Sequence, residues 1–111
     1  MDLYSELMQK VRELEASIRA LRTTGGAYAQ AEKDYKIILR QECLKLRDSG
    51  LAVGLIDKTC YGIPSVAEAR FKRDCAKVVY QANMDSINAT KLMIRILEGQ
   101  LNREWSAELS E

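Results

Sequence analysis

The sequence predicts an all-α protein, a long antiparallel helical hairpin that assembles into an oligomeric helical bundle. Apolar residues recur at alternating steps of four and three in two long stretches, the spacing of a helix that buries a narrow stripe against another helix. A single segment, which holds the chain's only proline, separates the two stretches. We therefore expect residues 1–111 to form one helical-hairpin domain.

The first helix is predicted over about residues 2–48. The Asp2 carboxylate can accept hydrogen bonds from the first turn, and Ser49-Gly50 supplies a C-terminal stop. Gly25 and Gly26 lie in its middle, and each glycine costs about 1 kcal/mol inside a helix, so we expect a break or kink there, with a hinge as one interpretation. Its apolar seam consists of Leu7, Val11, Leu14, Ile18 and Leu21.

The connection, residues 49–64, is too apolar for a free linker and is predicted to fold back on the hairpin, with a short helical turn near 52–58. The second helix is predicted over about residues 65–107. Pro64 and a capping box, Ser65 with Glu68, mark its start. Its seam consists of Ala76, Tyr80, Asn83, Ile87, Thr90, Ile94, Leu97 and Leu101.

The register of the hairpin follows from the position of its turn. If the turn is centred near residue 56, Gly25 and Gly26 face residues 83–90, which are rich in Asn, Asp, Ser and Thr. This polar stretch is either a ligand site or a layer in which Asn83 and Asn88 fix the register and limit the number of chains. The same register brings Cys43 near Cys75, and Tyr80 near Tyr28 and Tyr35.

A second apolar stripe on the second helix requires a second neighbour. Its members are Phe71, Cys75, Val78, Val79, Ala82, Ala89, Met93 and Ile96. We expect this neighbour to be another copy of the chain, with a dimer favoured. The predicted oligomer interface comprises Leu7, Val11, Leu14, Ile18, Leu21, Ile87, Ile94, Leu97 and Leu101.

The composition argues against several classes of function. The chain contains no histidine, so a catalytic triad and a His-based zinc site are excluded. Its three cysteines are scattered without a CxxC pair, which favours reduced thiols. We expect no enzyme activity, cofactor or metal. The first residues do not resemble a signal peptide and no apolar run approaches ~18 residues, so we expect a cytoplasmic protein that binds no membrane.

Basic residues concentrate around the predicted turn. Residues 36–77 hold nine Lys and Arg against five Asp and Glu, a net +4, while the rest of the chain carries −3. One interpretation is a solvated surface. The other is a phosphate-binding tip, since arginine offers a bidentate fork to phosphate. The candidate binding residues of this basic loop tip are Arg47, Lys58, Tyr61, Arg70 and Arg73.

The chain resembles a group of small uncharacterised helical proteins of phages and prophages of Gram-positive bacteria. The resemblance lies in Leu39-Arg40, in Thr59-Cys60-Tyr61-Gly62, and in the segments 69–74, 86–89 and 91–105. It implies a bacterial host and a protein that binds host defence or replication machinery or assists phage recombination.

We therefore expect a non-enzymatic protein that binds a host macromolecule and inhibits host defence. The alternative is a nucleic-acid-binding protein, or a sponge that sequesters a phosphorylated small molecule, acting through the basic loop tip. A purely structural coiled-coil adaptor is a third interpretation.

Overall fold

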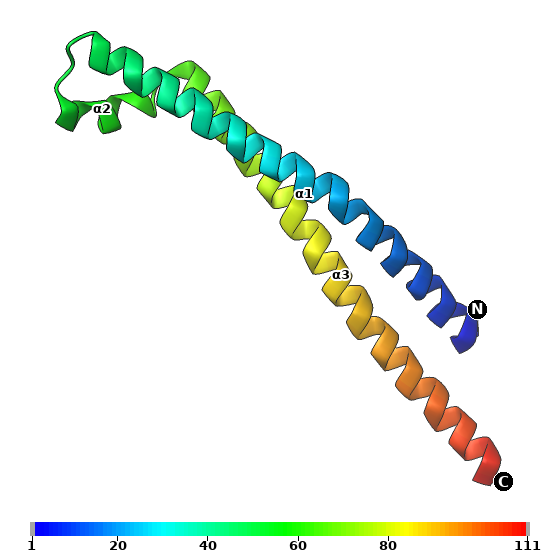
Figure 1. The fold of residues 1–111 in the computed structure, drawn as a ribbon. Helices are drawn as coiled ribbons and strands as arrows, with labels where there is room; N and C mark the ends of the chain where they lie inside the picture. Colours follow the sequence, from blue (N-terminus) through cyan, green and yellow to red (C-terminus); the bar gives the residue numbers. More distant parts are fainter. Residues whose placement is uncertain (1, 111) are drawn as a thin grey trace. The chain divides into compact units, whose positions relative to one another are not determined.

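The computed structural model describes residues 2–110, which form three helices and no strand. They are α1 (Leu3–Asp48), α2 (Val53–Cys60) and α3 (Pro64–Ser110), labelled in Figure 1. The predicted all-helical fold is confirmed. The helices predicted over about 2–48 and 65–107 differ from α1 and α3 by at most three residues at each end, and α2 lies within the segment predicted as the connection.

Asp2 caps the N-terminus of α1. Its Oδ1 accepts a hydrogen bond from the backbone N–H of Ser5, with 2.7 Å between the two atoms. This hydrogen bond lowers the pKa of the Asp2 carboxyl below its ordinary value, because it stabilises the charged form. One of the N–H groups that have no partner within the helix is thereby satisfied.

The C-terminus of α1 is closed by two backbone hydrogen bonds. The N–H of Gly50 donates to the carbonyl of Arg47 at 3.1 Å, and the N–H of Leu51 donates to that of Leu46 at 3.2 Å. Gly50 has a φ of +88°, a left-handed conformation that residues with a Cβ rarely adopt. This is the Schellman arrangement, so the predicted stop at Ser49-Gly50 has a clear structural basis.

The start of α3 differs from the prediction. Pro64 is the first helical residue, where its missing N–H costs nothing. The carbonyl of Ile63 accepts the first hydrogen bond, from the N–H of Ala67 at 2.9 Å. Ser65 therefore lies inside the helix and is not its N-cap, so the predicted capping box of Ser65 and Glu68 is wrong.

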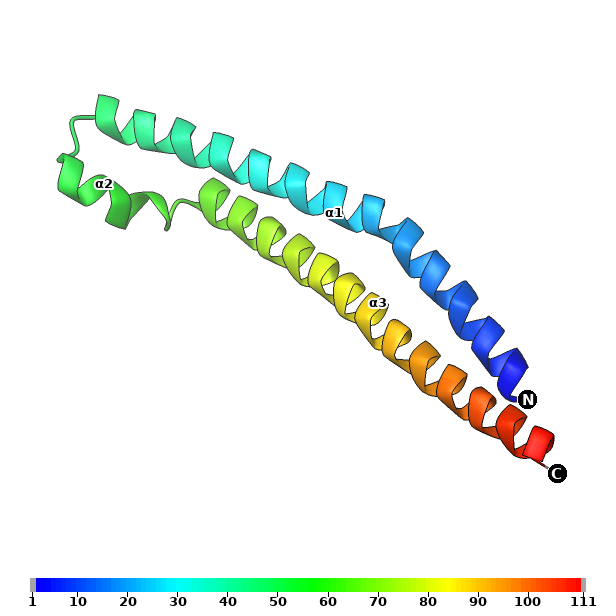
Figure 2. The same cartoon turned by 60° about the horizontal axis from the view of Figure 1, so that its bottom comes forward.

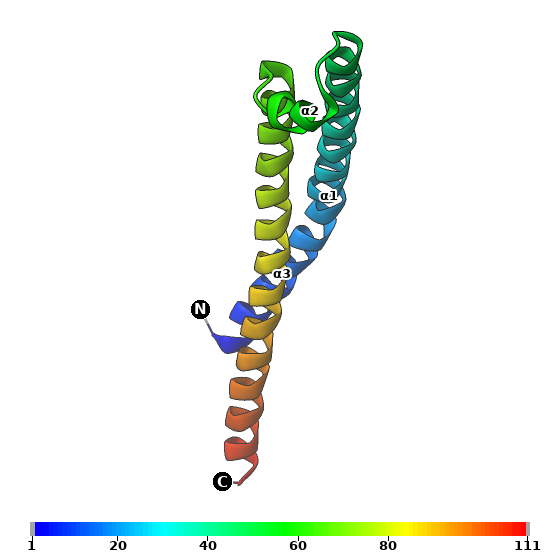
Figure 3. The same cartoon turned by 90° about the vertical axis from the view of Figure 1, so that its left-hand side faces the viewer.

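The chain forms two compact units, which are described separately. The α2 unit comprises Thr24–Tyr80, and the terminal unit comprises Met1–Thr23 with Gln81–Glu111. In the α2 unit, the α1 and α3 segments run antiparallel and side by side (Figure 2), and α2 lies between the end of α1 and the start of α3 (Figure 3). This unit is a helical hairpin.

The core of the α2 unit is small. Tyr35, Val66 and Ala69 are buried together, with Ile38, Leu39 and Ile63 partly buried against them. From α2, Ile56 and Cys60 are buried as well. The apolar connection therefore packs on the hairpin, as predicted from its composition.

The predicted register of the hairpin is wrong. A Cβ built at Gly25 would lie 3.4 Å from Cε2 of Tyr80, where a symmetric turn would place residue 87. The rings of Tyr28 and Tyr80 are 5.8 Å apart between their centres, so the predicted approach of Tyr80 to Tyr28 is confirmed despite the offset. The thiol of Cys60 lies beside that of Cys43, the place predicted for Cys75. The reason is α2, which folds back so that the turn is not centred on residue 56.

Helix α1 continues without interruption through Gly25 and Gly26, so the predicted break is absent. The free-energy cost of two glycines is offset by the packing of α1 on α3 in this unit, since tertiary packing provides most helical stability in proteins. Whether the helix bends at these glycines, and whether they act as a hinge, stay predictions.

In the terminal unit, residues 3–23 of α1 run antiparallel to residues 81–110 of α3 (Figure 2). Ile87 and Thr90 are buried, and the rest of the predicted α3 seam in this unit is partly buried. The seam of α1 matches the prediction except at Ile18, which is 48% exposed. The carbonyl of neighbouring Ser17 instead accepts a hydrogen bond of 3.0 Å from Nδ2 of Asn83.

Candidate interaction surfaces

At the basic loop tip, the structure brings two of the five predicted residues together. The guanidinium carbon of Arg70 lies 5.5 Å from the centre of the Tyr61 ring, within the range of a cation–π interaction. The Tyr61 side chain is 45% exposed and Arg70 is also exposed. The Tyr61 ring and the Arg70 cation therefore lie side by side, and both are exposed to solvent.

Arg73 is a structural residue. Its guanidinium carbon lies 4.5 Å from the centre of the buried Tyr35 ring. Its Nε and Nη2 donate hydrogen bonds of 3.0 and 2.9 Å to Oδ1 of Asp74. The hydrogen bond to Asp74 raises the pKa of Arg73, which stays charged. Arg73 therefore already contacts one carboxylate and one ring within the chain, and its binding of a phosphate stays a prediction.

The sequence contained a signal for this role of Arg73. It lies three residues before Ala76 and seven before Tyr80, and so continues the buried seam of α3 toward the N-terminus. At that position its guanidinium packs over the Tyr35 ring while its N–H groups reach Asp74.

Arg47 and Lys58 are both exposed, and among residues 2–110 neither forms an ion pair. Arg47 lies in the last turn of α1 and Lys58 in the last turn of α2. Within the described residues, neither forms a hydrogen bond or an ion pair with Arg70 or Tyr61. Convergence of these cations on one phosphate stays a prediction.

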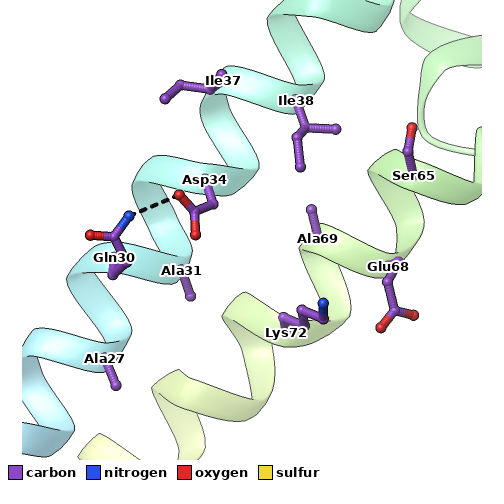
Figure 4. A pocket seen from close by; sticks show the side chains of 10 residues that line it. All are labelled: Ala27, Gln30, Ala31, Asp34, Ile37, Ile38, Ser65, Glu68, Ala69 and Lys72. Carbon is purple, nitrogen blue, oxygen red and sulfur yellow. Dashed lines mark hydrogen bonds between the residues drawn. The ribbon is translucent and has the colours of Figure 1, made fainter.

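A groove between α1 and α3 in the α2 unit was not expected from the sequence. Its volume is about 690 Å³. Figure 4 shows Ala31 and Ile38 of α1 directed toward α3, and Ala69 of α3 directed toward α1. Asp34, Glu68 and Lys72 supply charges to its wall, and Asp34 accepts a hydrogen bond of 2.9 Å from Gln30. The small side chains at 27, 31 and 69 leave the space.

A second groove, of about 480 Å³, lies in the terminal unit. Met93, Ile96 and Leu97 of α3 form its apolar wall, and Glu6, Gln9 and Lys10 of α1 form its polar wall. Lys10 is paired with Glu13 at 3.0 Å, and this pairing lowers the pKa of the Glu13 carboxyl. A two-helix layer is too thin to fill either groove by itself.

Most residues predicted for the oligomer interface already have neighbours within the chain. Leu7, Val11, Leu14 and Leu21 are partly buried on α1, while Ile18 is exposed. Facing them on α3, Ile87 is buried and Ile94, Leu97 and Leu101 are partly buried. Their burial does not by itself require a second chain.

The second stripe of α3 lies on the outer face of the helix, defined here as the face opposite its buried seam. Every predicted member of this stripe is exposed. Phe71 and Val78 are each 63% exposed and Val79 is 55% exposed in the α2 unit, and Ile96 is 52% exposed in the terminal unit. Leu92, at 57%, belongs to the same face but was not among the predicted residues.

Part of the polar stretch 83–90 takes part in helix packing, and the rest is exposed. Asn83 bonds to Ser17, and the hydroxyl of buried Thr90 donates to the carbonyl of Ser86 at 2.8 Å. Asn88 is exposed and does not join Asn83 in a layer. Within the α2 unit, it is Tyr80 that lies against Gly25, where this stretch was predicted.

The structure contains no group of three or more Cys, Asp or Glu side chains within residues 2–110 that could hold a metal ion. Within the same residues, no helix has an apolar segment long enough to cross a membrane. Comparison of the chain with models of known families, with curated proteins and with solved structures finds no match.

Proposed function

We propose that this protein acts by binding another protein through the outer face of α3 in the α2 unit. The observation that carries the proposal is the exposure of Phe71, Val78 and Val79, together with exposed Cys75, on that face. Burial of such a side chain is worth roughly 1.5–3 kcal/mol, so an uncovered cluster is a common mark of an interaction site.

The geometry favours a helical or apolar partner. In the α2 unit one face of α3 packs on α1, and the opposite face stays free along several turns. A partner helix laid on that face would complete a three-helix layer, since residues four and three apart present one continuous ridge. In the bacterial setting that the phage resemblance implies, the partner is a host protein, and its inhibition is the proposed outcome.

Recovery of a partner with matched variants tests this proposal. The wild type, Phe71→Glu with Val78→Glu, and the control Lys77→Glu would each capture proteins from host lysate at physiological salt. We expect a stoichiometric protein with the wild type and the control and its loss with the double variant. Circular dichroism would show that all three fold. No stoichiometric protein, or equal recovery with all three variants, would overturn the proposal.

A second candidate function is supported by the exposed Arg70–Tyr61 pair, which offers a stacking surface and a cation to a nucleotide. Binding to nucleic acid would weaken steeply with salt, while a bound small phosphorylated molecule would raise the melting temperature. Both effects would be lost in Tyr61→Ala with Arg70→Ala. If the wild type shows neither effect, the tip is a solvated surface.

We also propose that the chain associates with itself, with a dimer as the preferred state. Leu92 and Ile96 are more than half exposed in the terminal unit, and two helices supply little core of their own. Light scattering coupled to size exclusion would measure the mass across concentrations, and a stable mass of 12.6 kDa would contradict this proposal. Substitution of Ile94 and Leu97 is unsuitable for this test, because both are partly buried within the chain.

A further inference from the structure

We infer that the chain dimerises through the outer face of α3 between residues 85 and 103, as an antiparallel pair in which Asp85 of each copy meets Arg103 of the other. This inference rests on the proposed self-association and specifies its surface, its direction and its charged contacts. The partner is a second copy of the same helix, related by a two-fold axis.

The outer face carries a seam of its own in this segment. Its members follow steps of 4, 3, 4, 3 and 4 residues, the spacing of a coiled coil. They are Asp85, Ala89, Leu92, Ile96, Gly99 and Arg103. The buried seam of α3, which includes Ile87 and Ile94, follows the same spacing on the opposite side of the helix. α3 thus presents two seams, of which α1 covers one.

The two ends of the outer seam carry opposite charges. Asp85 and Arg103 are exposed, and among residues 2–110 neither forms an ion pair or a side-chain hydrogen bond. A two-fold axis beside residue 94 brings Asp85 opposite the second copy's Arg103, and Arg103 opposite its Asp85. Oppositely charged pairs at both ends define the register of the pairing.

The same axis pairs the remaining members by size. Leu92 meets Ile96 of the second copy in each of two central layers, and Ala89 meets Gly99 in each of the two layers that flank them. These small residues permit close approach of the helices, so that Leu92 and Ile96, now 57% and 52% exposed, become buried. From one end of the pairing to the other, the six layers are charged, small, large, large, small and charged. The order of layers is therefore the same from both ends.

A parallel pairing of the two α3 helices is unfavourable because it brings like charges together. In register, it would place Asp85 against Asp85 and Arg103 against Arg103, and like charges in direct contact are unfavourable. A shift of register would lose the contact between the large apolar residues. The antiparallel arrangement is the one in which both charged and apolar residues find complementary partners.

The flanks of the seam are compatible with this packing. Asn88 would lie near Asn102 of the second copy, and Met93 near its own symmetry mate; all three residues are exposed. Arg95 also approaches its symmetry mate, and this repulsion limits the affinity. At present, the Nη1 of Arg103 lies 3.4 Å from a Cβ built at Gly99, which places the Arg103 side chain on the outer face.

Sedimentation velocity on the full chain at several concentrations tests the inference. Asp85→Arg and Arg103→Asp, each alone, put like charges together in two layers, and each should weaken dimerisation on the order of tenfold or more. The double variant Asp85→Arg with Arg103→Asp exchanges the charges and should restore dimerisation to near the wild-type level. Glu98→Arg, a charge reversal off the outer seam on the same helix, should leave it unchanged.

The outcomes separate this inference from the proposals it rests on. A wild-type monomer overturns both the self-association and the inference, but leaves the binding of another protein intact. A wild-type dimer that is insensitive to the two single variants, or that the double variant fails to restore, overturns the inference alone. Circular dichroism on each variant ensures that a loss of dimer is not a loss of helix.

Discussion

The side-chain amide of Asn83 donates a hydrogen bond of 3.0 Å to the backbone carbonyl of Ser17, 66 residues earlier in the chain. A polar side chain thus sits in the apolar seam of the terminal unit and contacts the opposite helix directly. The carbonyl of Ser17 lies at one height along α1, so this hydrogen bond specifies the register of α1 against α3 within that unit.

Replacement of Asn83 should therefore cost more than replacement of an exposed asparagine. Asn83→Ala removes a hydrogen bond of about 1 kcal/mol, which corresponds to a fall in melting temperature of about 4–8 °C in a domain of this size. Asn88→Ala, at an exposed position, is the control and should change the melting temperature little. Thermal denaturation followed by circular dichroism measures both, and equal effects would contradict the assigned contact.

The two central glycines should respond differently to alanine. A Cβ at Gly26 meets no atom within 4 Å, so Gly26→Ala should stabilise α1 by about 1 kcal/mol. A Cβ at Gly25 would lie 3.4 Å from Cε2 of Tyr80, at the short limit of van der Waals contact, so Gly25→Ala should gain less than Gly26→Ala. Urea denaturation compares the two. A larger gain at Gly25 would show that the ring does not pack there.

Replacement of Arg73 should destabilise the fold, whereas replacement of Arg70 at the surface should not. Arg73→Ala exposes the buried Tyr35 ring and leaves Asp74 without its partner, so we expect a loss of roughly 1–2 kcal/mol. Arg70→Ala removes an exposed contact with Tyr61 and should change stability within about 0.5 kcal/mol. Chemical denaturation distinguishes these cases, and an equal loss at both positions would refute the structural assignment of Arg73.

The three thiols should differ in reactivity toward an aromatic disulfide reagent at neutral pH. Cys75 is exposed and should react first, Cys43 more slowly, and buried Cys60 last. Burial raises the pKa of the Cys60 thiol, and the neighbouring Cys43 thiol adds to this, so Cys60 also holds less thiolate. Kinetics of labelling in Cys75→Ser should lack the fast phase, and a fast phase that persists would place another thiol at the surface.

Acid should weaken the first turn of α1 through Asp2. The pKa of this carboxyl is lowered in the folded state, so its contribution to stability is full above the ordinary pKa of an aspartate and is lost as the pH falls through the lowered one. Amide exchange at Ser5, measured by NMR, should therefore speed up at acid pH relative to the intrinsic rate. In Asp2→Ala the opening of this turn should already be high at neutral pH and change little with acid.

Several features of the fold could be predicted because they depend on local sequence. The ends of α1 follow from Asp2 and from Ser49-Gly50, which act within a few residues of their position. The seam of α3 follows from spacing alone, since a stripe repeated every 3.5 residues must face another helix. The exposure of the second stripe follows from the same spacing, because that spacing places the second stripe on the face of α3 opposite the buried seam.

The candidate site was less predictable, because its geometry depends on contacts between distant residues. The distribution of charge indicated the basic loop tip but gave no sign that Tyr35 and Asp74 engage Arg73. The groove beside Ala31 and Ala69 needs both helices in place before it exists. Small residues that are far apart in the chain form no pattern that predicts they will lie side by side in the fold.

The sequence by itself determined that this protein is helical, where its long helices end, and which stripe of each helix is apolar. The tertiary structure decided the register, and with it every contact between helices. Helix α2 folds back to place Cys60 beside Cys43, which brings Tyr80 to Gly25 in place of residue 87. Periodicity specifies which face of a helix is buried, but a repeated pattern matches its partner equally well at several offsets, and only the packing of specific side chains selects one.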